Sequence, residues 1–510
     1  MNSRHINNIT TKTVLSLLAI AALNSSVLAE ESVSEQLKML KAQIVKLENQ
    51  LNEQNSKVEK QLLQNSKKIT KVEKKVKKTS KKLNLVKAHD AGDNIKWDVD
   101  FRTQIDSLQY ELGSGKKVEN SSLLSNRLWL GMKYQADDNT LFRGILGYNK
   151  IYGDNRAQVD DTSTGNNAQF DWVTNESITN DNALKVKEAY WLYTNDSFFG
   201  NEDVPWSASV GRRPSTDGLG ISLRVDQERK SALSHTVNVE FDGGSLKFDL
   251  DKVTGINGMW LKFCGGRGLT NSKLRFSSDG LDYTKDSTTQ NVDMAGFIFV
   301  PYDDGQYSVH MNYAQAWNLI GNLDANGDGA SDDGGKFHSF GDIEYFTSMV
   351  KVDGIGDGIS DFLDDSIFFA SYAQSKTSPN AGQSMLGSSQ SQTGHSYWIG
   401  LNIPDGMTED GRFGLEWNRG SKYWRSMTYG EDTAVGSKIA ARGTAWEAYY
   451  NKSLTKALSS SVRFTQIDYD YTGSNGFFGD LGAPNDSNSA AGTNAVKKAQ
   501  NITAYIRYQF

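Results

Sequence analysis

The chain has 510 residues, a formal net charge of −6 and one cysteine, Cys264, so an internal disulfide is excluded. Mean hydropathy is low at −0.55, yet the chain holds 47 Gly, 22 Phe, 21 Tyr and 11 Trp. Low hydropathy with abundant aromatic residues and glycine suits a membrane β-barrel, because every second strand residue faces water.

Residues 1–29 have the pattern of a secretory signal peptide. Arg4 and Lys12 are positively charged, 14–23 is a short apolar run, and 27–29 ends in the small residue Ala29. The apolar run is too short to span a membrane, and no later segment reaches the required length. Any membrane crossing must therefore be made by strands, and export makes nucleic acid an unexpected partner.

Residues 30–88 predict a helical coiled coil. Apolar residues recur at alternating spacings of four and three, with one stutter, at positions 33, 37, 40, 44, 47, 51, 58, 62, 69, 72, 76, 83 and 86. Gln54, Asn65 and Thr79 fall at seam positions and can fix its register. Such a seam needs partner chains, so we expect a homo-oligomer. The seam residues do not fix the number of chains.

Lysines crowd the second half of this helix, at 67, 68, 71, 74, 75, 77, 78, 81 and 82. They form either a solvated outer face or a contact with an anionic surface such as cell-wall polymer or the membrane. A linker follows at 89–96. The remainder, 97–510, is acidic, which favours cations if the chain is a channel.

From residue 97 onward, alternation of apolar and polar residues predicts about sixteen strands. Trp97, Phe101 and Ile105 form the first outward face, and Val186 and Tyr190 belong to the fourth. The sixth and seventh strands are expected to form a hairpin across 242–245. The predicted strands are 97–105, 124–134, 142–148, 186–192, 206–210, 237–241, 246–250, 292–300, 307–317, 343–352, 367–373, 396–403, 412–417, 444–452, 462–470 and 501–510.

The final strand, 501–510, alternates strictly. Ile502, Ala504, Ile506, Tyr508 and Phe510 share one face. Such a face can meet lipid, with aromatic residues at the membrane interface, or it can be the edge strand of a soluble sandwich. The terminal aromatic residue resembles the recognition signal of Gram-negative outer-membrane barrels, so we interpret Phe510 as an assembly signal.

Connections between the predicted strands alternate in length. Those after even-numbered strands are mostly short, and those after odd-numbered strands, such as 153–183, 213–234, 318–342 and 420–442, are long. Outer-membrane barrels have short periplasmic turns and long external loops. The alternation therefore favours a barrel. It also puts both Phe510 and the predicted coiled coil at 30–88, which we call the stalk, in the periplasm.

Together these features resemble a Gram-negative outer-membrane porin, and more closely an uncharacterised porin-like family with a periplasmic coiled coil. The run Ser209-Val210-Gly211-Arg212-Arg213-Pro214 resembles a porin strand entering its constriction loop. The resemblance implies an all-β transmembrane antiparallel barrel of about 16 strands, preceded by an α-helical coiled coil. Because porin barrels are commonly trimers, it also favours three chains in the homo-oligomer.

The resemblance also implies a pore constriction, in which the third external loop folds inward and its acids face basic wall residues. Carried over, the loop side is Asp217, Asp226 and Glu228, beside Arg224 and Arg229. The wall side is Arg102, Arg127, Arg143, Lys187 and Arg213, with Lys185 nearby. A transverse field of this kind orients polar solutes, although a polar lumen carries charges even without a filter.

One acidic-glycine run matches part of a calcium loop. Asp324, Asn326, Asp328 and Asp332 take positions 1, 3, 5 and 9, with Gly329 at position 6, but Gly335 stands where the bidentate acid belongs. The run is either a Ca²⁺ site or a flexible acidic external loop. A second run at 353–364 fits less well, and no other cofactor is indicated.

The function predicted is passive diffusion of ions and small polar solutes across the outer membrane, and no enzyme signature is present. One alternative is a structural tether between the outer membrane and the cell wall, through the lysine-rich stalk. Another is an outer-membrane hydrolase built from a wall Ser and a His, which needs no local motif.

Overall fold

The computed structural model describes residues 38–39, 41–46, 49, 95–153, 184–213, 217–227, 233–273, 275–285, 290–324, 332, 337–356, 358–408, 410–429, 431, 433–474, 476–489 and 494–510. The chain divides into two compact units, 1–86 and 87–510. In the first unit the described residues are helical. The remainder of the predicted signal peptide, stalk and linker lies outside the described residues, apart from Ile95 and Lys96.

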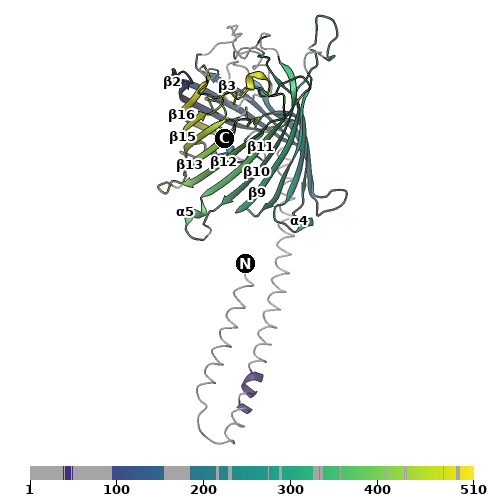
Figure 1. The fold of residues 1–510 in the computed structure, drawn as a ribbon. Helices are drawn as coiled ribbons and strands as arrows, with labels where there is room; N and C mark the ends of the chain where they lie inside the picture. Colours follow the sequence, from purple (N-terminus) through teal and green to yellow (C-terminus); the bar gives the residue numbers. More distant parts are fainter. Residues whose placement is uncertain are drawn as a thin grey trace. The chain divides into compact units, whose positions relative to one another are not determined.

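The second unit is a closed antiparallel barrel of sixteen strands in which each strand pairs with its sequence neighbours (Figure 1). The last strand closes the barrel against the first, in the register Phe101 to Tyr508. The strands are β1 (Lys96–Leu112), β2 (Lys117–Gln135), β3 (Thr140–Ile151), β4 (Lys185–Asn195), β5 (Trp206–Arg213), β6 (Phe241–Asp249), β7 (Trp260–Leu269), β8 (Val292–Asp303), β9 (Tyr307–Gly321), β10 (His338–Asp353), β11 (Ile367–Pro379), β12 (Thr393–Pro404), β13 (Gly411–Gly420), β14 (Gly443–Ser453), β15 (Leu458–Tyr469) and β16 (Val496–Gln509).

The two ends of the barrel differ, as the sequence predicts. Connections after even-numbered strands are short, the longest being 354–366, and two of them hold the single-turn helices α4 (Asp251–Thr254) and α5 (Asp361–Asp364) (Figure 1). We call this the turn end. Connections after odd-numbered strands lie at the opposite, loop end, and most are long, although 113–116 is short and 380–392 has the same length as 354–366. Both the start of β1 and Phe510 lie at the turn end.

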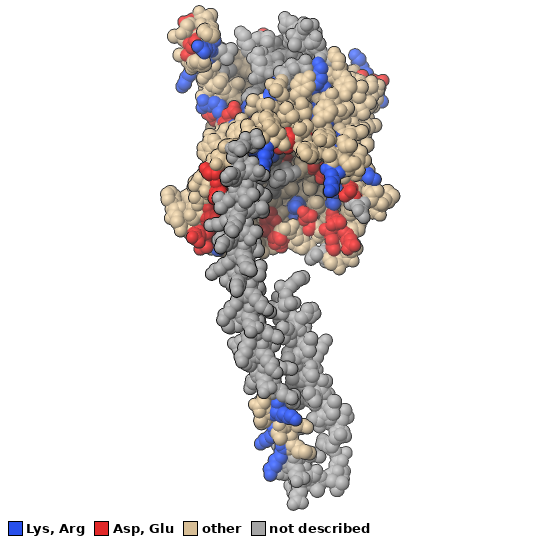
Figure 2. Space-filling view, turned by 180° about the vertical axis from the view of Figure 1, so that it is seen from behind, with Lys and Arg blue, Asp and Glu red and all other residues tan. Residues whose placement is uncertain are grey.

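Alternation along each strand separates two environments. On β1 the side chains of Trp97, Phe101 and Ile105 are exposed on the outside, whereas Asp100 and Arg102 are buried inside. Figure 2 shows the matching surface: a largely tan upper wall, with acidic side chains gathered around the turn end. The apolar face is thus on the outside of the barrel, the reverse of a soluble protein. None of the described helices is long and apolar enough to cross a membrane.

Two sequence predictions are wrong. Residues 242–245 form no hairpin, because β6 runs straight through them and pairs with β5 on one side and β7 on the other. The predicted sixth strand, 237–241, lies largely in the loop before β6. The sequence predicts no strand between 250 and 292, where β7 lies, so the count of sixteen is right because these two errors cancel. Tyr190 is buried rather than outward-facing, because a register shift between Ile145 and Leu146 changes the facing of β4.

Candidate functional site

The candidate functional site is the lumen, where two long loops fold inward from the loop end. We call residues 214–240 the β5–β6 loop and residues 421–442 the β13–β14 loop. The first includes the short helix α3 (Ile221–Arg224), and most of its described residues are buried. The loops join through a parallel bridge between Val237 and Met427, with backbone hydrogen bonds of 2.8 Å from Asn238 N to Met427 O and from Met427 N to Thr236 O.

Wall contacts hold the β5–β6 loop against β10, β11 and β12. His235 is fully buried, and its two ring nitrogens lie 2.8 Å from Ser371 Oγ and 2.9 Å from Ser396 Oγ. Thr236 Oγ1 lies 2.8 Å from Thr347 Oγ1. Desolvation by burial lowers the pKa of His235 to about 3, so the ring is neutral at pH 7 and serves as a hydrogen-bonding anchor.

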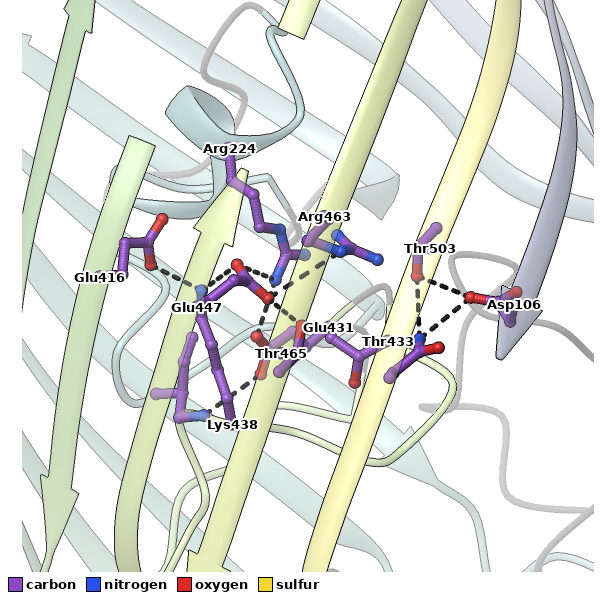
Figure 3. Close-up of polar contacts among 12 residues, drawn as sticks. Asp106, Arg224, Glu416, Glu431, Thr433, Lys438, Glu447, Arg463, Thr465 and Thr503 are labelled. Atoms are coloured by element: carbon purple, nitrogen blue, oxygen red, sulfur yellow. Dashed lines mark hydrogen bonds and ion pairs between the residues drawn. The ribbon is translucent and has the colours of Figure 1, made fainter. Parts of the chain in front are cut away.

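The two loops also meet in a buried group of charges, which we call the lumen ion cluster (Figure 3). Arg224 Nη1 on α3 lies 2.9 Å from Glu431 Oε1 and 3.5 Å from Glu447 Oε1. Lys438 Nζ lies 2.6 Å from Glu416 Oε2 and also contacts Glu447. The cluster has three cations and three anions, namely Arg224, Lys438, Arg463, Glu416, Glu431 and Glu447.

Neutral groups add hydrogen bonds to the cluster. Trp398 Nε1 donates to Glu416 Oε2 at 2.8 Å, and Thr465 Oγ1 donates to Glu447 Oε2 at 2.7 Å. Buried ions offset their desolvation cost only when such bonds satisfy them. The cluster therefore fixes the position of α3 and of the β13–β14 loop relative to the wall.

The wall at the barrel closure carries a second set of ion pairs. Arg507 on β16 donates to both oxygens of Asp100 on β1, at 2.8 and 2.5 Å, and Arg127 Nη2 lies 3.4 Å from Asp100 Oδ2. Arg507 Nη1 also donates to Val225 O at 3.1 Å. The closing strands are therefore bonded directly to the β5–β6 loop just beyond α3.

The wall cations predicted from the sequence all come from β1 to β5. Arg102 lies over the Tyr505 ring and Arg127 over the Trp129 ring. Arg143 lies 3.9 Å from Glu188, and Lys187 lies 2.8 Å from Glu240. Arg213 lies over the Tyr190 ring at 4.1 Å. The carboxylates beside these cations are thus Asp100, Glu188 and Glu240, which the sequence did not single out.

The predicted loop acids are placed differently from one another. Asp217 is buried and Asp226 is exposed, and both have left-handed backbone, with φ of 56° and 49°. Glu228 and Arg229 lie outside the described residues, and Lys185 begins β4. The described part of the loop does fold inward, as the resemblance implies.

The proposed calcium run is only partly described. Asn326 and Asp328 lie outside the described residues. Asp324 N donates to Asp480 Oδ2 at 3.2 Å, and Asp332 N donates to Leu323 O at 3.0 Å. Among the residues that the structure describes, no group of three or more His, Cys, Asp or Glu side chains could hold a metal ion. Calcium binding therefore stays a prediction.

The sequence missed the β13–β14 loop and its partners. Glu416 lies between Leu415 and Trp417, and Glu447 lies between Trp446 and Ala448, so strand alternation could have identified both carboxylates as inward-facing. The inward course of the loop carrying Glu431 and Lys438 has no local signal, because it depends on contacts with α3.

The chain resembles solved outer-membrane proteins at low identity. Salmonella typhi OmpF, in a complex with daunomycin, is 11% identical, with a TM-score of 0.44, over 82% of this chain and 99% of that one. An anion-selective porin from Comamonas acidovorans is 12% identical, with a TM-score of 0.43, over 82% and 99%. Pseudomonas putida OprB is 11% identical, with a TM-score of 0.44, over 83% and 96%.

A search of curated protein sequences finds no match. Residues 117–510 match the family described as "Protein of unknown function (DUF3373)". That match covers β2 to β16 and both inward loops, which is most of the chain. The chain therefore belongs to the DUF3373 family.

Proposed function

We propose that the protein is a channel of the Gram-negative outer membrane through which ions and small polar solutes diffuse. The observation that carries this proposal is the facing of the closed barrel, with apolar side chains such as Phe101 and Ile105 outside and charged ones such as Asp100 and Arg507 inside. A closed barrel satisfies its backbone hydrogen bonds within lipid, and a polar lumen is what a water-filled path requires.

The test is the conductance of purified protein in planar lipid bilayers. We expect discrete current steps whose size scales with salt concentration. Insertion is verified separately, by resistance of the barrel to protease in liposomes. Protein that inserts but carries no current would refute the channel and favour the structural tether.

The constriction is proposed to lie where the β5–β6 loop approaches the wall, with Asp217, Asp226 and Glu228 on the loop side and Arg102, Arg127, Arg143, Lys187 and Arg213 on the wall side. The hydrogen bond from Arg507 on the wall to the carbonyl of Val225 in this loop supports this placement. Changing Arg127 and Arg143 to Glu should shift the reversal potential in a salt gradient. The control is Arg419→Glu, because Arg419 forms a half-exposed pair with Asp470 and lies outside the lumen.

The stalk is proposed to lie in the periplasm and to join three chains. Turns of outer-membrane barrels are periplasmic, and β1, which follows the stalk in sequence, begins at the turn end. Ile44, a predicted seam residue, is 48% exposed in the single chain, as expected for a residue that a partner helix would cover. The lysines of the stalk are proposed to contact cell-wall polymer, and the outer face of the barrel is proposed to contact membrane lipid.

The surroundings of His235 disfavour hydrolysis at this histidine. The ring is fully buried, its nitrogens are both occupied by serine hydroxyls, and Trp398 and Trp424 pack against it. A catalytic His needs access to substrate and an orienting group. Incubating the inserted protein with a short-chain nitrophenyl ester should release no nitrophenolate above the background rate.

A further inference from the structure

The inward face of one wall sector, β5 to β8, is rich in small residues. Register pairs place these residues side by side across the sheet: Ser209 with Ser245, Gly211 with Gly243, Gly243 with Gly266, Ser245 with Cys264, and Cys264 with Gly296. The opposite wall carries Trp398, Glu416 and Glu447 at inward positions, packed against the two loops. Because their side chains are small, volume remains unfilled in the lumen next to β5–β8. Large side chains fill the corresponding volume elsewhere.

A cavity of about 100 Å³ lies along this sector. Ser245, Cys264 and Gly296 form part of its wall side, and Leu233 and Val237 of the β5–β6 loop form part of its inner side. Cys264 and Lys262 are partly exposed, whereas the lumen ion cluster is almost completely buried. Solvent therefore reaches the lumen on the β6–β8 side.

The charged side chains of this sector are mainly positive. Arg213 and Lys262 line the cavity, and no carboxylate is among the described residues that do so. Lys247 is paired directly with Lys262 across β6 and β7. Like charges opposite one another repel in a sheet. Because both lysines are on the lumen side, their positive electrostatic potentials add there.

The turn-end mouth of the sector is mixed in charge. Lys247 Nζ lies 2.6 Å from Asp249 Oδ1, and both side chains are partly exposed, at 33% and 39%. Lys247 also lies over the Trp260 ring at 5.0 Å. Moving inward from this mouth, a solute meets Lys262 and then Arg213, with uncharged residues such as Cys264, Gly243 and Met294 between them on the wall.

We propose that the solute path runs between the β5–β8 wall and the β5–β6 loop, and that Lys262 and Arg213 make it selective for small anions. The proposal rests on the channel function. It reverses the cation preference expected from the acidic composition, because the local charge in a narrow path outweighs the charge of exposed turns and loops. Small carboxylates and inorganic anions have the chemistry that this lining would favour.

Cys264 is the only cysteine in the chain and lines the cavity, so the native protein carries its own probe. Protein in liposomes is treated with an anionic or a cationic methanethiosulfonate reagent, and labelling is followed by mass spectrometry. After normalising to the rates in unfolded protein, we expect the anionic reagent to react about tenfold faster, the lower end of electrostatic steering. Lys262→Gln should reduce this ratio.

The same labelling is then made on single channels in bilayers. We expect a stepwise fall in conductance on modification, and Cys264→Ser should abolish the response. Faster labelling by the cationic reagent, no labelling of folded protein, or unchanged conductance after complete labelling would each overturn the path. If the barrel conducts but its conductance does not change after labelling of Cys264, this inference alone is refuted. If the barrel never conducts, the channel and the path are refuted together.

Discussion

Arg224 Nη1 and Glu431 Oε1 lie 2.9 Å apart although 207 positions separate the two residues in sequence. This contact joins the β5–β6 loop to the β13–β14 loop inside the barrel, and both side chains are fully buried. A fold that buries such a pair depends on both partners, because either charge alone would remain desolvated and uncompensated.

Arg224→Ala should destabilise the barrel and loosen α3. Loss of one partner from a buried ion pair costs about 3–5 kcal/mol, so the urea midpoint of tryptophan fluorescence should fall and open-channel current noise should rise. Arg267→Ala is the matched control, since the Arg267–Asp293 pair is about half exposed and such pairs contribute about 0–1 kcal/mol. Equal shifts for the two variants would contradict a structural role for Arg224.

Lys438→Met tests the other half of the lumen ion cluster. Lys438 contacts both Glu416 and Glu447, so its loss leaves two buried carboxylates near each other without their shared cation. We expect a cost of about 3–5 kcal/mol, again read from urea unfolding. Adding Glu416→Gln removes one of the two negative charges and should restore part of the loss. A double variant less stable than the single one would argue against charge repulsion as the cause.

Gly220→Ala tests the packing between α3 and the wall. Gly220 has a φ of +98°, and a Cβ there would overlap the Trp398 ring. Overpacking of this kind costs about 1–3 kcal/mol, and displacement of Trp398 should shift the fluorescence emission. Gly382→Ala is the comparison, because its φ is also positive, at +77°, but its Cβ would meet no atom within 4 Å. The emission shift should be absent from that variant.

Deleting Phe510 should impair barrel closure without changing the conductance of channels that do form. Phe510 exchanges two backbone hydrogen bonds with Val99, of 3.0 and 2.9 Å, and its ring is 83% exposed on the turn-end rim. Phe510→Ala keeps the backbone bonds and loses only the ring, so comparing the two variants separates closure from interface anchoring. A changed single-channel conductance would instead place Phe510 in the pore.

Removing residues 30–88 should leave the barrel folded and reduce the oligomer. Light scattering of the detergent-solubilised protein should give a mass near three chains for the full protein and a lower mass for the deletion variant. Bilayer conductance per barrel should stay the same, because the strands that close the sheet, β1 to β16, all begin after residue 88. An unchanged oligomeric mass would show that barrel contacts alone hold the chains together.

Most of the barrel could be predicted from sequence because alternation reports directly on two-sided strands. The run Trp97, Phe101, Ile105 lies outside as expected, and connection lengths gave the two ends correctly. The alternation pattern missed a strand where glycines occupy positions that carry apolar side chains in other strands. Gly265, Gly266 and Gly268 removed the apolar signal from β7, while Val237 and Val239, which pack inside the barrel, imitated a strand.

The lumen was harder to predict than the wall. Inward cations such as Arg102 and Arg127 could be read from strand alternation, but their partners could not, since Asp100, Glu188 and Glu240 reach them only through strand register and loop folding. The small inward residues of β5–β8 were equally hidden. The sequence does not show that these residues lie side by side, because their neighbours in the sheet are set by the strand register.

The bridge between Val237 and Met427 sets an order for biogenesis. Its two halves belong to connections far apart along the chain, so it cannot form until β13 and β14 have joined the growing sheet. Until then the β5–β6 loop lacks its backbone bonds to the β13–β14 loop, so the contact between the two loops is completed only near the end of assembly.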